Sequence, residues 1–313
     1  MGLLWMITEL LVIAVTFAAL GLGFAIIFES FRRRHNNAHV ESGNAIFEDP
    51  NSLKQVPCPN ISDPAEKYIS LIIPAFNEEL RLPGALDETM NYLQQRAAKD
   101  KSFSYEVVIV DDGSADGTNR VAFDFVKKYT IDNVRVLLLG RNYGKGEAIR
   151  QGMLHSRGEL LLMLDADGAT KVTDLEKLEN QIHVVAMKEI QFGDSATGDS
   201  SLRISDIPLA AFGSRAHLEE KALATEVVPQ FLMKGFHVVV LLTCGFKMFT
   251  RRWCFDVELV YLCKWFGIPM IEISVNWSEI PGSKVNPLSI PNMLWELALM
   301  SAGYRTGMWK IST

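Results

Sequence analysis

Cysteine is scarce in this sequence, with only four in 313 residues. No two of them have the CxxC spacing of a zinc site, and four are too few for a dense disulfide framework. The cysteines are Cys58, Cys244, Cys254 and Cys263. This usage excludes the small disulfide-stapled class of secreted domains and fits a reducing, cytosolic environment.

An excess of positive charge is also missing. The formal net charge is -6, so the chain as a whole has no attraction for nucleic acid, whose binding proteins carry a basic face. Apolar residues make up 48% and charged residues 22% of the chain, which excludes wholesale disorder. A chain of 313 residues has room for one large catalytic domain and a membrane anchor.

Charged residues are absent from residues 10–28 near the N-terminus. As a helix, this stretch would span about 28 Å, close to the thickness of a bilayer core. Arg32, Arg33 and Arg34 follow it, and no Lys or Arg precedes it. The positive-inside rule therefore predicts an anchor over residues 1–34, with Met1 outside the cytosol and the rest of the chain inside. A cleaved signal peptide, the alternative, carries its positive charge before the apolar stretch.

Two glycosylation sequons make this orientation testable. They begin at Asn60 and Asn276. If the domain faces the cytosol, neither asparagine carries a glycan.

Short apolar runs alternate with amphipathic stretches from Tyr68 onward. The predicted strands are residues 68–75, 106–110, 134–139, 159–164, 209–212 and 270–275, and the predicted helices are residues 83–96, 117–129, 144–155 and 174–188. Apolar strands that alternate with helices favour an α/β fold with a mostly parallel sheet covered on both faces. In such sheets, ligands bind beyond the carboxyl ends of the strands.

The remaining segments lie on either side of this alternating pattern. Residues 35–66 are polar, contain four prolines and are interpreted as a linker. A catalytic domain is expected over residues 67–287, and a C-terminal segment over residues 288–313. Residues 290–304 are apolar but too short to span a bilayer comfortably, so we interpret them as an interfacial helix, with a core-packing helix as the alternative.

Polar and acidic residues follow the first two predicted strands. Asn77 and Glu78 follow the first, where their side chains could form hydrogen bonds with a ligand. The alternative is that Asn77 caps a helix. Asp111 and Asp112 follow the second, and they can accept hydrogen bonds from a base and a ribose. A structural turn rich in Asp, Gly and Ser is the alternative there. The GxGxxG pattern of a Rossmann dinucleotide site is missing.

Asp165 and Asp167 stand one residue apart after the fourth predicted strand. Two carboxylates at a strand terminus repel each other, and a divalent cation removes this cost because hard cations prefer oxygen ligands. Mg²⁺ or Mn²⁺ bound there could also bridge a donor's diphosphate and neutralise the leaving group. The pattern therefore predicts a metal site.

A glycine-rich stretch, residues 140–146, lies between these acidic motifs and contains Arg141 and Lys145. Glycine allows close backbone approach, and Arg or Lys would meet the charge of a phosphate. The GxxxxGK[ST] spacing of a Walker loop is missing. A strand-to-helix turn with solvated cations is the alternative.

These motifs together resemble the sequential signature of inverting family-2 glycosyltransferases with the GT-A fold. Longer motifs in the second half resemble one group within that family, the dolichyl-phosphate β-glucosyltransferases. They are residues 213–218, 244–249, 252–259, 275–284 and 303–307. The resemblance runs from the anchor almost to the C-terminus. It implies a GT-A nucleotide-sugar-binding fold preceded by a single transmembrane helix.

The resemblance also implies a reaction and its site. Glucose would pass from UDP-glucose to dolichyl phosphate with inversion, at the cytosolic face of the endoplasmic reticulum membrane, giving dolichyl β-D-glucosyl phosphate for protein N-glycosylation. The donor-binding residues would be Pro74, Asn77, Glu78, Asp111, Asp112, Lys145 and Lys284. Asp165 and Asp167 would hold Mg²⁺ or Mn²⁺. The catalytic residues would be Arg215, Lys247 and Asp256.

The second half departs from the family pattern in three places. Residues 238–243 run straight into Cys244, where the family has a glycine-rich loop ending in Asp-Thr-Gln. Arg251 abuts Arg252, where the family has a further helical segment. Residues 226–230 include a helix-breaking proline in place of a basic and aromatic stretch. All three changes fall in the acceptor half, so we expect donor and metal binding to survive and transfer to be impaired.

Two other functions remain open from the sequence. A GDP-mannose-dependent polyprenyl-phosphate transferase would share the donor architecture, because the choice of base and sugar is not visible in the motifs. A catalytically impaired membrane-bound relative that binds donor only is favoured by the shortened segments. A processive polysaccharide synthase fits less well, since the sequence has no QxxRW motif.

Overall fold

The computed structural model describes residues 2–41, 46–197, 207–214, 237–241, 254–278, 280 and 289–309. The chain forms two compact units. The helical unit comprises Met1–Asn44 and Val285–Ser312, and the sheet unit comprises Ala45–Lys284 with Thr313.

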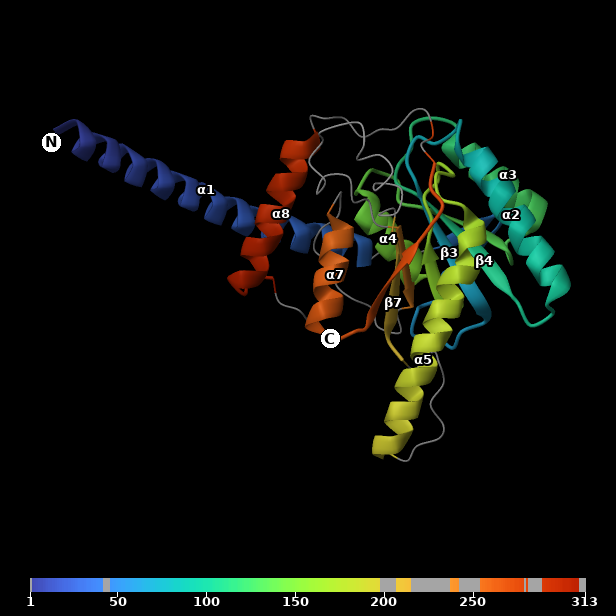
Figure 1. Ribbon diagram of the computed structural model, residues 1–313. Helices are drawn as coiled ribbons and strands as arrows, with labels where there is room; N and C mark the ends of the chain where they lie inside the picture. Colours follow the sequence, from blue (N-terminus) through green and yellow to red (C-terminus); the bar gives the residue numbers. More distant parts are fainter. Residues whose placement is uncertain are drawn as a thin grey trace. The chain divides into compact units, whose positions relative to one another are not determined.

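A seven-stranded sheet with strand order β5-β4-β3-β6-β8-β7-β9 forms the centre of the sheet unit (Figure 1). Its strands are β3 (Lys67–Ala75), β4 (Tyr105–Asp111), β5 (Val134–Leu138), β6 (Gly158–Met163), β7 (Leu209–Ser214), β8 (His237–Leu241) and β9 (Met270–Ser274). Neighbouring strands are parallel except at β8, which is antiparallel to β6 and β7. The predicted mostly parallel α/β sheet is confirmed, but no strand was predicted where β8 lies.

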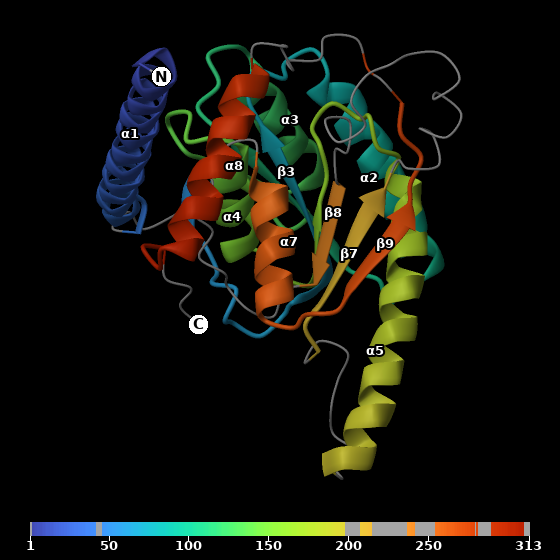
Figure 2. The same cartoon turned by 60° about the vertical axis from the view of Figure 1, so that its left-hand side comes forward.

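Helices cover both faces of the sheet because its strands are apolar on both sides. In β3, Leu71 and Ile73 belong to one buried core cluster and Ile72 to the other. The first cluster includes residues of α2 (Leu82–Lys99), α3 (Thr118–Tyr129) and α5 (Leu175–Thr197), which follows the single turn η1 (Val172–Asp174). The second includes residues of α4 (Lys145–Leu154) and α7 (Phe255–Trp265). Figure 2 shows α5 beside β7 and β9.

A two-stranded hairpin precedes the sheet within the same unit. In it, β1 (Ile46–Asp49) pairs antiparallel with β2 (Lys54–Pro57). Phe47 is fully buried in the cluster that contains Ile72, and the Arg135 guanidinium lies 4.3 Å from the centre of its ring. The segment interpreted as a linker thus contains a packed element, because one aromatic side chain fixes a stretch that is otherwise polar and rich in proline.

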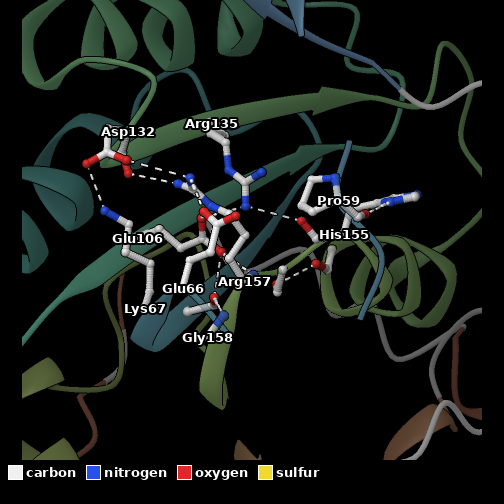
Figure 3. A network of polar contacts seen from close by, with 12 residues as sticks. Pro59, Glu66, Lys67, Glu106, Asp132, Arg135, His155, Arg157 and Gly158 are labelled. Carbon is white, nitrogen blue, oxygen red and sulfur yellow. Dashed lines mark hydrogen bonds and ion pairs between the residues drawn. The ribbon is translucent and has the colours of Figure 1, made fainter. Parts of the chain in front are cut away.

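A buried network of charges lies at the amino ends of the parallel strands (Figure 3). Glu106 in β4 has no exposed surface, and it accepts hydrogen bonds from Ser70 Oγ at 2.6 Å and Arg157 Nε at 2.9 Å. It also forms an ion pair with Arg135 of β5. Arg157 donates in turn to the carbonyl oxygen of Asp132 at 3.0 Å. The network ties β3, β4 and β5 together at the edge opposite their carboxyl ends.

The helical unit contains α1 (Gly2–Glu41) and α8 (Ser289–Arg305), which contact each other. Within α1, the 25 residues Trp5–Glu29 have a mean hydropathy of 2.7, and the stretch is long and apolar enough to cross a membrane. Large side chains such as Leu10 and Phe17 are exposed along this stretch, as expected of a helix that faces lipid. The predicted apolar N-terminal helix is therefore present.

Candidate active site

The carboxyl ends of β3, β4 and β6 lie side by side at one edge of the sheet. Parallel pairing aligns Ala75 with Asp111 and Ile72 with Met163, so the loops that follow these strands begin at the same edge. Three acidic motifs singled out in the sequence stand in these loops or at their start. The structure therefore brings together the residues after β3, β4 and β6 that the sequence proposed for donor and metal binding.

Asn77 links the loop after β3 to the loop after β4. Its backbone N–H donates to Ser114 Oγ at 2.9 Å, and its Oδ1 accepts the Ala115 N–H at 2.8 Å. Its φ of 53° lies in the left-handed region, which asparagine tolerates better than most residues. Because α2 begins only at Leu82, Asn77 does not cap that helix. Its role in the structure is to hold two site loops together.

Asp112 holds the glycine-rich loop in place. Its buried carboxylate accepts the backbone N–H groups of Tyr143 at 2.6 Å and Gly144 at 2.8 Å. Burial raises the pKa of this carboxyl to about 6, although both N–H donors act in the opposite direction and Asp111 adds a smaller upward effect. Since Gly144 directly precedes α4, Asp112 also fixes the position from which Lys145 extends.

Asp111 shapes the turn that follows β4. Its Oδ2 accepts the N–H groups of Gly113 at 3.2 Å and Ser114 at 3.1 Å. Gly113 has a φ of 74°, and a Cβ atom there would lie 2.4 Å from the carbonyl carbon of Arg141. Only glycine lets the turn approach the glycine-rich loop this closely. Asp111 and Asp112 thus both organise loops, and their contact with a base and a ribose stays a prediction.

The two acidic residues after β6 each face a basic side chain. Asp165 forms an ion pair with Lys145 of α4. Asp167 Oδ2 lies 3.7 Å from Arg81 Nη1. In this structure, the repulsion between the two carboxylates is therefore offset by a lysine and an arginine.

Arg81 is a site residue that sequence reasoning missed. Its guanidinium donates to both oxygens of Glu78, at 2.7 and 2.6 Å, while it also faces Asp167. The sequence did offer a signal for the first pair, since an Arg three residues after a Glu can pair with it on one helical turn. It offered none for the second, because Asp167 reaches the same guanidinium only through the parallel pairing of β3 and β6.

Lys145 also approaches the start of α7. Its ammonium lies 5.7 Å from the centre of the Phe255 ring. Burial lowers the pKa of Lys145, but the ion pair with Asp165 outweighs it, so that the pKa is raised. Asp167 and Asp256 contribute to this rise. Lys145 is therefore charged at neutral pH, and Asp256, predicted as catalytic, lies within electrostatic range of it.

The chemistry of this edge fits a divalent cation that shares its ligands with a phosphate. Asp165 and Asp167 offer hard carboxylate oxygens and are both partly exposed. Across the described part of the chain, no three His, Cys, Asp or Glu side chains are grouped closely enough to hold a metal by themselves. Proteins commonly bind Mg²⁺ through one or two carboxylates together with substrate phosphates, so two carboxylates are sufficient for such a cation.

Three predicted site residues lie outside the described residues, namely Arg215, Lys247 and Lys284. Residues 226–230 and the junctions at Cys244 and Arg252 also lie outside them. Pro74, predicted to bind the donor, is placed in β3 opposite Val110 of β4.

Residues 70–184 of the chain match the family described as glycosyl transferase family 2. The chain is 43% identical over 277 residues to the dolichyl-phosphate β-glucosyltransferase of Homo sapiens, with 81% of each protein covered. It is 39% identical over 322 residues to that of Drosophila melanogaster, covering 95% of this chain and 93% of the relative. The chain belongs to the dolichyl-phosphate β-glucosyltransferase family. The family member of Saccharomyces cerevisiae is 32% identical, with 80% of each protein covered.

Membership of the dolichyl-phosphate β-glucosyltransferase family confirms the resemblance drawn from the sequence. The alignment with the Drosophila relative runs over 322 positions, more than the 313 residues of this chain. That alignment therefore includes positions that have no counterpart in this chain. Among solved structures, the glucosyl-3-phosphoglycerate synthase of Mycobacterium tuberculosis in complex with Mn²⁺, UDP and phosphoglyceric acid is similar, with a TM-score of 0.44 and 16% identity over 77% of this chain and 79% of that one.

Proposed function

We propose that this chain transfers glucose from UDP-glucose to dolichyl phosphate, with inversion at the anomeric carbon. The observation that carries the proposal is the meeting of Asp165, Asp167 and Lys145 at the carboxyl edge of the sheet, in a member of the dolichyl-phosphate β-glucosyltransferase family. A sugar nucleotide presents an anionic diphosphate, which suits a lysine and a cation held by carboxylates. The products are dolichyl β-D-glucosyl phosphate and UDP.

The donor is proposed to bind along the loops after β3, β4 and β5. The residues assigned to uridine and ribose are Pro74, Asn77, Glu78, Asp111 and Asp112. Lys145 and Lys284 are assigned to the diphosphate. Support comes from the hydrogen bonds that fix these loops before any ligand binds, such as Asn77 to Ala115 and Asp112 to Gly144, because a preorganised site loses less entropy on binding.

Asp165 and Asp167 are proposed to hold Mg²⁺ or Mn²⁺, which when bound would neutralise charge on the departing diphosphate. Lys145 lies beside the same carboxylates and can share that task. The two carboxylates that would bind the metal are incomplete as a ligand set without phosphate oxygens. Metal binding is therefore tied to the binding of UDP-glucose.

In the proposed reaction, an oxygen of dolichyl phosphate attacks the anomeric carbon of glucose on the face opposite UDP. A bond from that carbon to the acceptor oxygen forms as its bond to the β-phosphate oxygen breaks, and the bonding electron pair leaves with UDP. The acceptor phosphate is already ionised at pH 7, so the chain needs no strong general base. Its main task is to hold two anions close together, which clustered positive charge achieves.

The three residues predicted to be catalytic are assigned to the acceptor side. Arg215 and Lys247 are proposed to contact phosphate oxygens, and Asp256 is proposed as a catalytic carboxylate. For Asp256, support comes from its nearness to the Lys145 ammonium, whose pKa it helps to raise after the larger effects of Asp165 and Asp167. For Arg215 and Lys247, support comes from family motifs in the sequence.

The site is proposed to face the cytosol at the endoplasmic reticulum membrane. Residues 1–34 would form the anchor, and residues 67–287 the catalytic domain, with the hairpin of residues 46–57 packed onto it rather than part of a free linker. Residues 288–313 would lie in the membrane interface and help to present the lipid acceptor. The exposed side chains of Leu294 and Trp295 on α8 support this last assignment.

A second candidate is a relative that binds UDP-glucose without transferring it. It is favoured by the location of the sequence departures in the acceptor half. The donor half of the sequence has no such departure.

The test measures UDP-glucose binding and glucosyl transfer on one preparation of the full chain, in liposomes that contain dolichyl phosphate, with Mn²⁺ present. The proposal expects binding, formation of a β-glucosyl lipid, and weaker competition by GDP-mannose and UDP-N-acetylglucosamine. Binding without transfer would establish the donor-only relative. Absence of UDP-glucose binding contradicts both, and stronger binding of GDP-mannose would replace the assigned donor.

A further inference from the structure

Each carboxylate of the predicted metal pair has a basic side chain as its neighbour. Lys145 pairs with Asp165, and Arg81 faces Asp167 at 3.7 Å. A divalent cation that binds both carboxylates must therefore compete with two positive charges already present. A metal ion and a basic side chain that share one carboxylate repel each other. The basic side chain that moves away more easily therefore determines how tightly the metal binds.

Arg81 is held by two hydrogen bonds, and Lys145 by an ion pair at the end of a flexible side chain. Arg81 donates two hydrogen bonds to Glu78, in a forked geometry that fixes the guanidinium plane. Arg81 Nη1 lies 3.7 Å from Asp167 Oδ2, which is too long for a hydrogen bond, so this contact is electrostatic. Lys145 has a single compact charge on a flexible stem, and 37% of its side chain is exposed.

The position of Lys145 allows its ammonium a second partner besides Asp165. It is the first residue of α4, directly after Gly144, whose N–H is fixed by Asp112. Helix N-termini favour anions such as phosphate. A diphosphate near the start of α4 would therefore meet the ammonium of Lys145 as well as the end of the helix.

We propose that Lys145 exchanges partners during donor binding: it neutralises Asp165 in the empty site and moves to the diphosphate when a nucleoside diphosphate enters, so that nucleotide and divalent cation bind cooperatively. The inference rests on the proposed function, because it requires a diphosphate and a metal at this edge. A bound nucleotide removes the competing charge from Asp165, and a bound cation leaves Lys145 free for phosphate. By linkage, each raises the affinity of the other by the same factor.

The test is a titration of the full-length chain in detergent with Mn²⁺, in the absence and presence of saturating UDP, followed by calorimetry and by the electron paramagnetic resonance of free Mn²⁺. For the parent chain we expect UDP to tighten Mn²⁺ binding about tenfold or more, within the range usual for coupled sites. In Lys145→Met, Mn²⁺ alone should bind more tightly than to the parent, and UDP alone more weakly. The tightening by UDP should fall toward a factor of one.

Two further variants separate this exchange from a general effect of removing a lysine. Lys145→Arg keeps the positive charge and should keep Mn²⁺ weak in the absence of UDP. Lys67→Met removes a lysine that is also paired with an aspartate, Asp132 at 2.7 Å, but at the opposite edge of the sheet. It should behave as the parent does. Thermal melting of every variant shows that the comparison is made between folded proteins.

The inference is overturned if the tightening by UDP is the same in Lys145→Met as in the parent, if Mn²⁺ alone binds Lys145→Met more weakly, or if the parent shows no tightening. These results are distinct from failure of the proposed function. A chain that transfers glucose without such coupling keeps the function and loses the exchange. A chain whose coupling depends on Lys145 but which transfers no glucose keeps the exchange and loses the transfer.

Discussion

The carboxylate of Asp112 accepts the backbone N–H of Gly144 at 2.8 Å, and so joins the end of β4 to the start of α4. The same carboxylate binds the N–H of Tyr143 at 2.6 Å. An ionised carboxylate can accept both bonds, whereas a protonated one gives up part of that capacity. The ionisation of one buried side chain therefore controls the loop that positions Lys145.

We predict that affinity for UDP-glucose increases as the pH rises through about 6, the value to which burial raises the pKa of Asp112. Between about pH 4 and 6, Asp112 is protonated in the folded chain and ionised in the unfolded chain. The stability that Asp112 contributes therefore falls as the pH rises through this window and is constant above it. UDP-glucose binding is measured by calorimetry from pH 5 to 8. Asp112→Asn should remove the step, and an unchanged step in that variant would contradict the assignment.

We predict that Gly113→Ala destabilises the chain by about 1–3 kcal/mol, the usual cost of enforced backbone strain, and weakens UDP-glucose binding. The added Cβ would lie 2.4 Å from the carbonyl carbon of Arg141, and the residue has a positive φ of 74°. Gly267→Ala is the matched control, because Gly267 has a φ of 67° with no atom within 4 Å of the added carbon. Melting and binding are measured together. Equal effects of the two substitutions on UDP-glucose binding would show that the close approach has no role in it.

We predict that Glu106→Gln lowers the free energy of unfolding by about 3–5 kcal/mol, as expected when one partner of a buried ion pair is neutralised. Glu106 is fully buried and is the shared acceptor for Arg135 and Arg157. Urea unfolding of the full chain in detergent measures the change. Asp124→Asn, in an exposed pair with Lys127 at 3.0 Å, should cost less than about 1 kcal/mol. A similar small loss in both variants would mean that the network of Figure 3 contributes little.

We predict that Asn60 carries no glycan when the chain is inserted into microsomes. Asn60 is exposed, so its modification depends on the compartment rather than on access. Asn276 is less informative, because its side chain donates to Asp174 at 3.0 Å. Gel mobility before and after glycosidase treatment checks this, with a sequon in a long tag ahead of Met1 as the positive control. A glycan on Asn60 would reverse the proposed orientation.

Much of the sheet could be predicted because its strands are apolar on both faces and its turns are rich in glycine and aspartate. Strand β8 had a local signal, since residues 237–241 include three consecutive valines, which favour a strand. Its antiparallel place between β6 and β7 could not be predicted, because it is decided by tertiary pairing. Phe47 was missed for a related reason. A single buried aromatic in a polar, proline-rich stretch has no periodicity to reveal it.

The site divides in the same way. Asp165 and Asp167 could be proposed because their spacing at a strand end is chemically unusual. The partners of these residues could not, since Lys145 and Arg81 reach them from α4 and from the residue before α2. The two carboxylates do need positive charge nearby, as their spacing indicates, but the chain supplies part of that charge itself.

In the proposed function, Asp165 and Asp167 hold a cation against the diphosphate of a sugar nucleotide. The most direct measurement is the binding of Mn²⁺ and UDP-glucose to the full-length Asp165→Asn, Asp167→Asn double variant, with Asp124→Asn as a surface control and melting as a check on folding. We expect the folded double variant to lose about tenfold or more of its affinity for Mn²⁺ in the presence of UDP-glucose, since even the outer-shell partners of metal ligands are commonly worth that much. A double variant that binds both as tightly as the parent would contradict it.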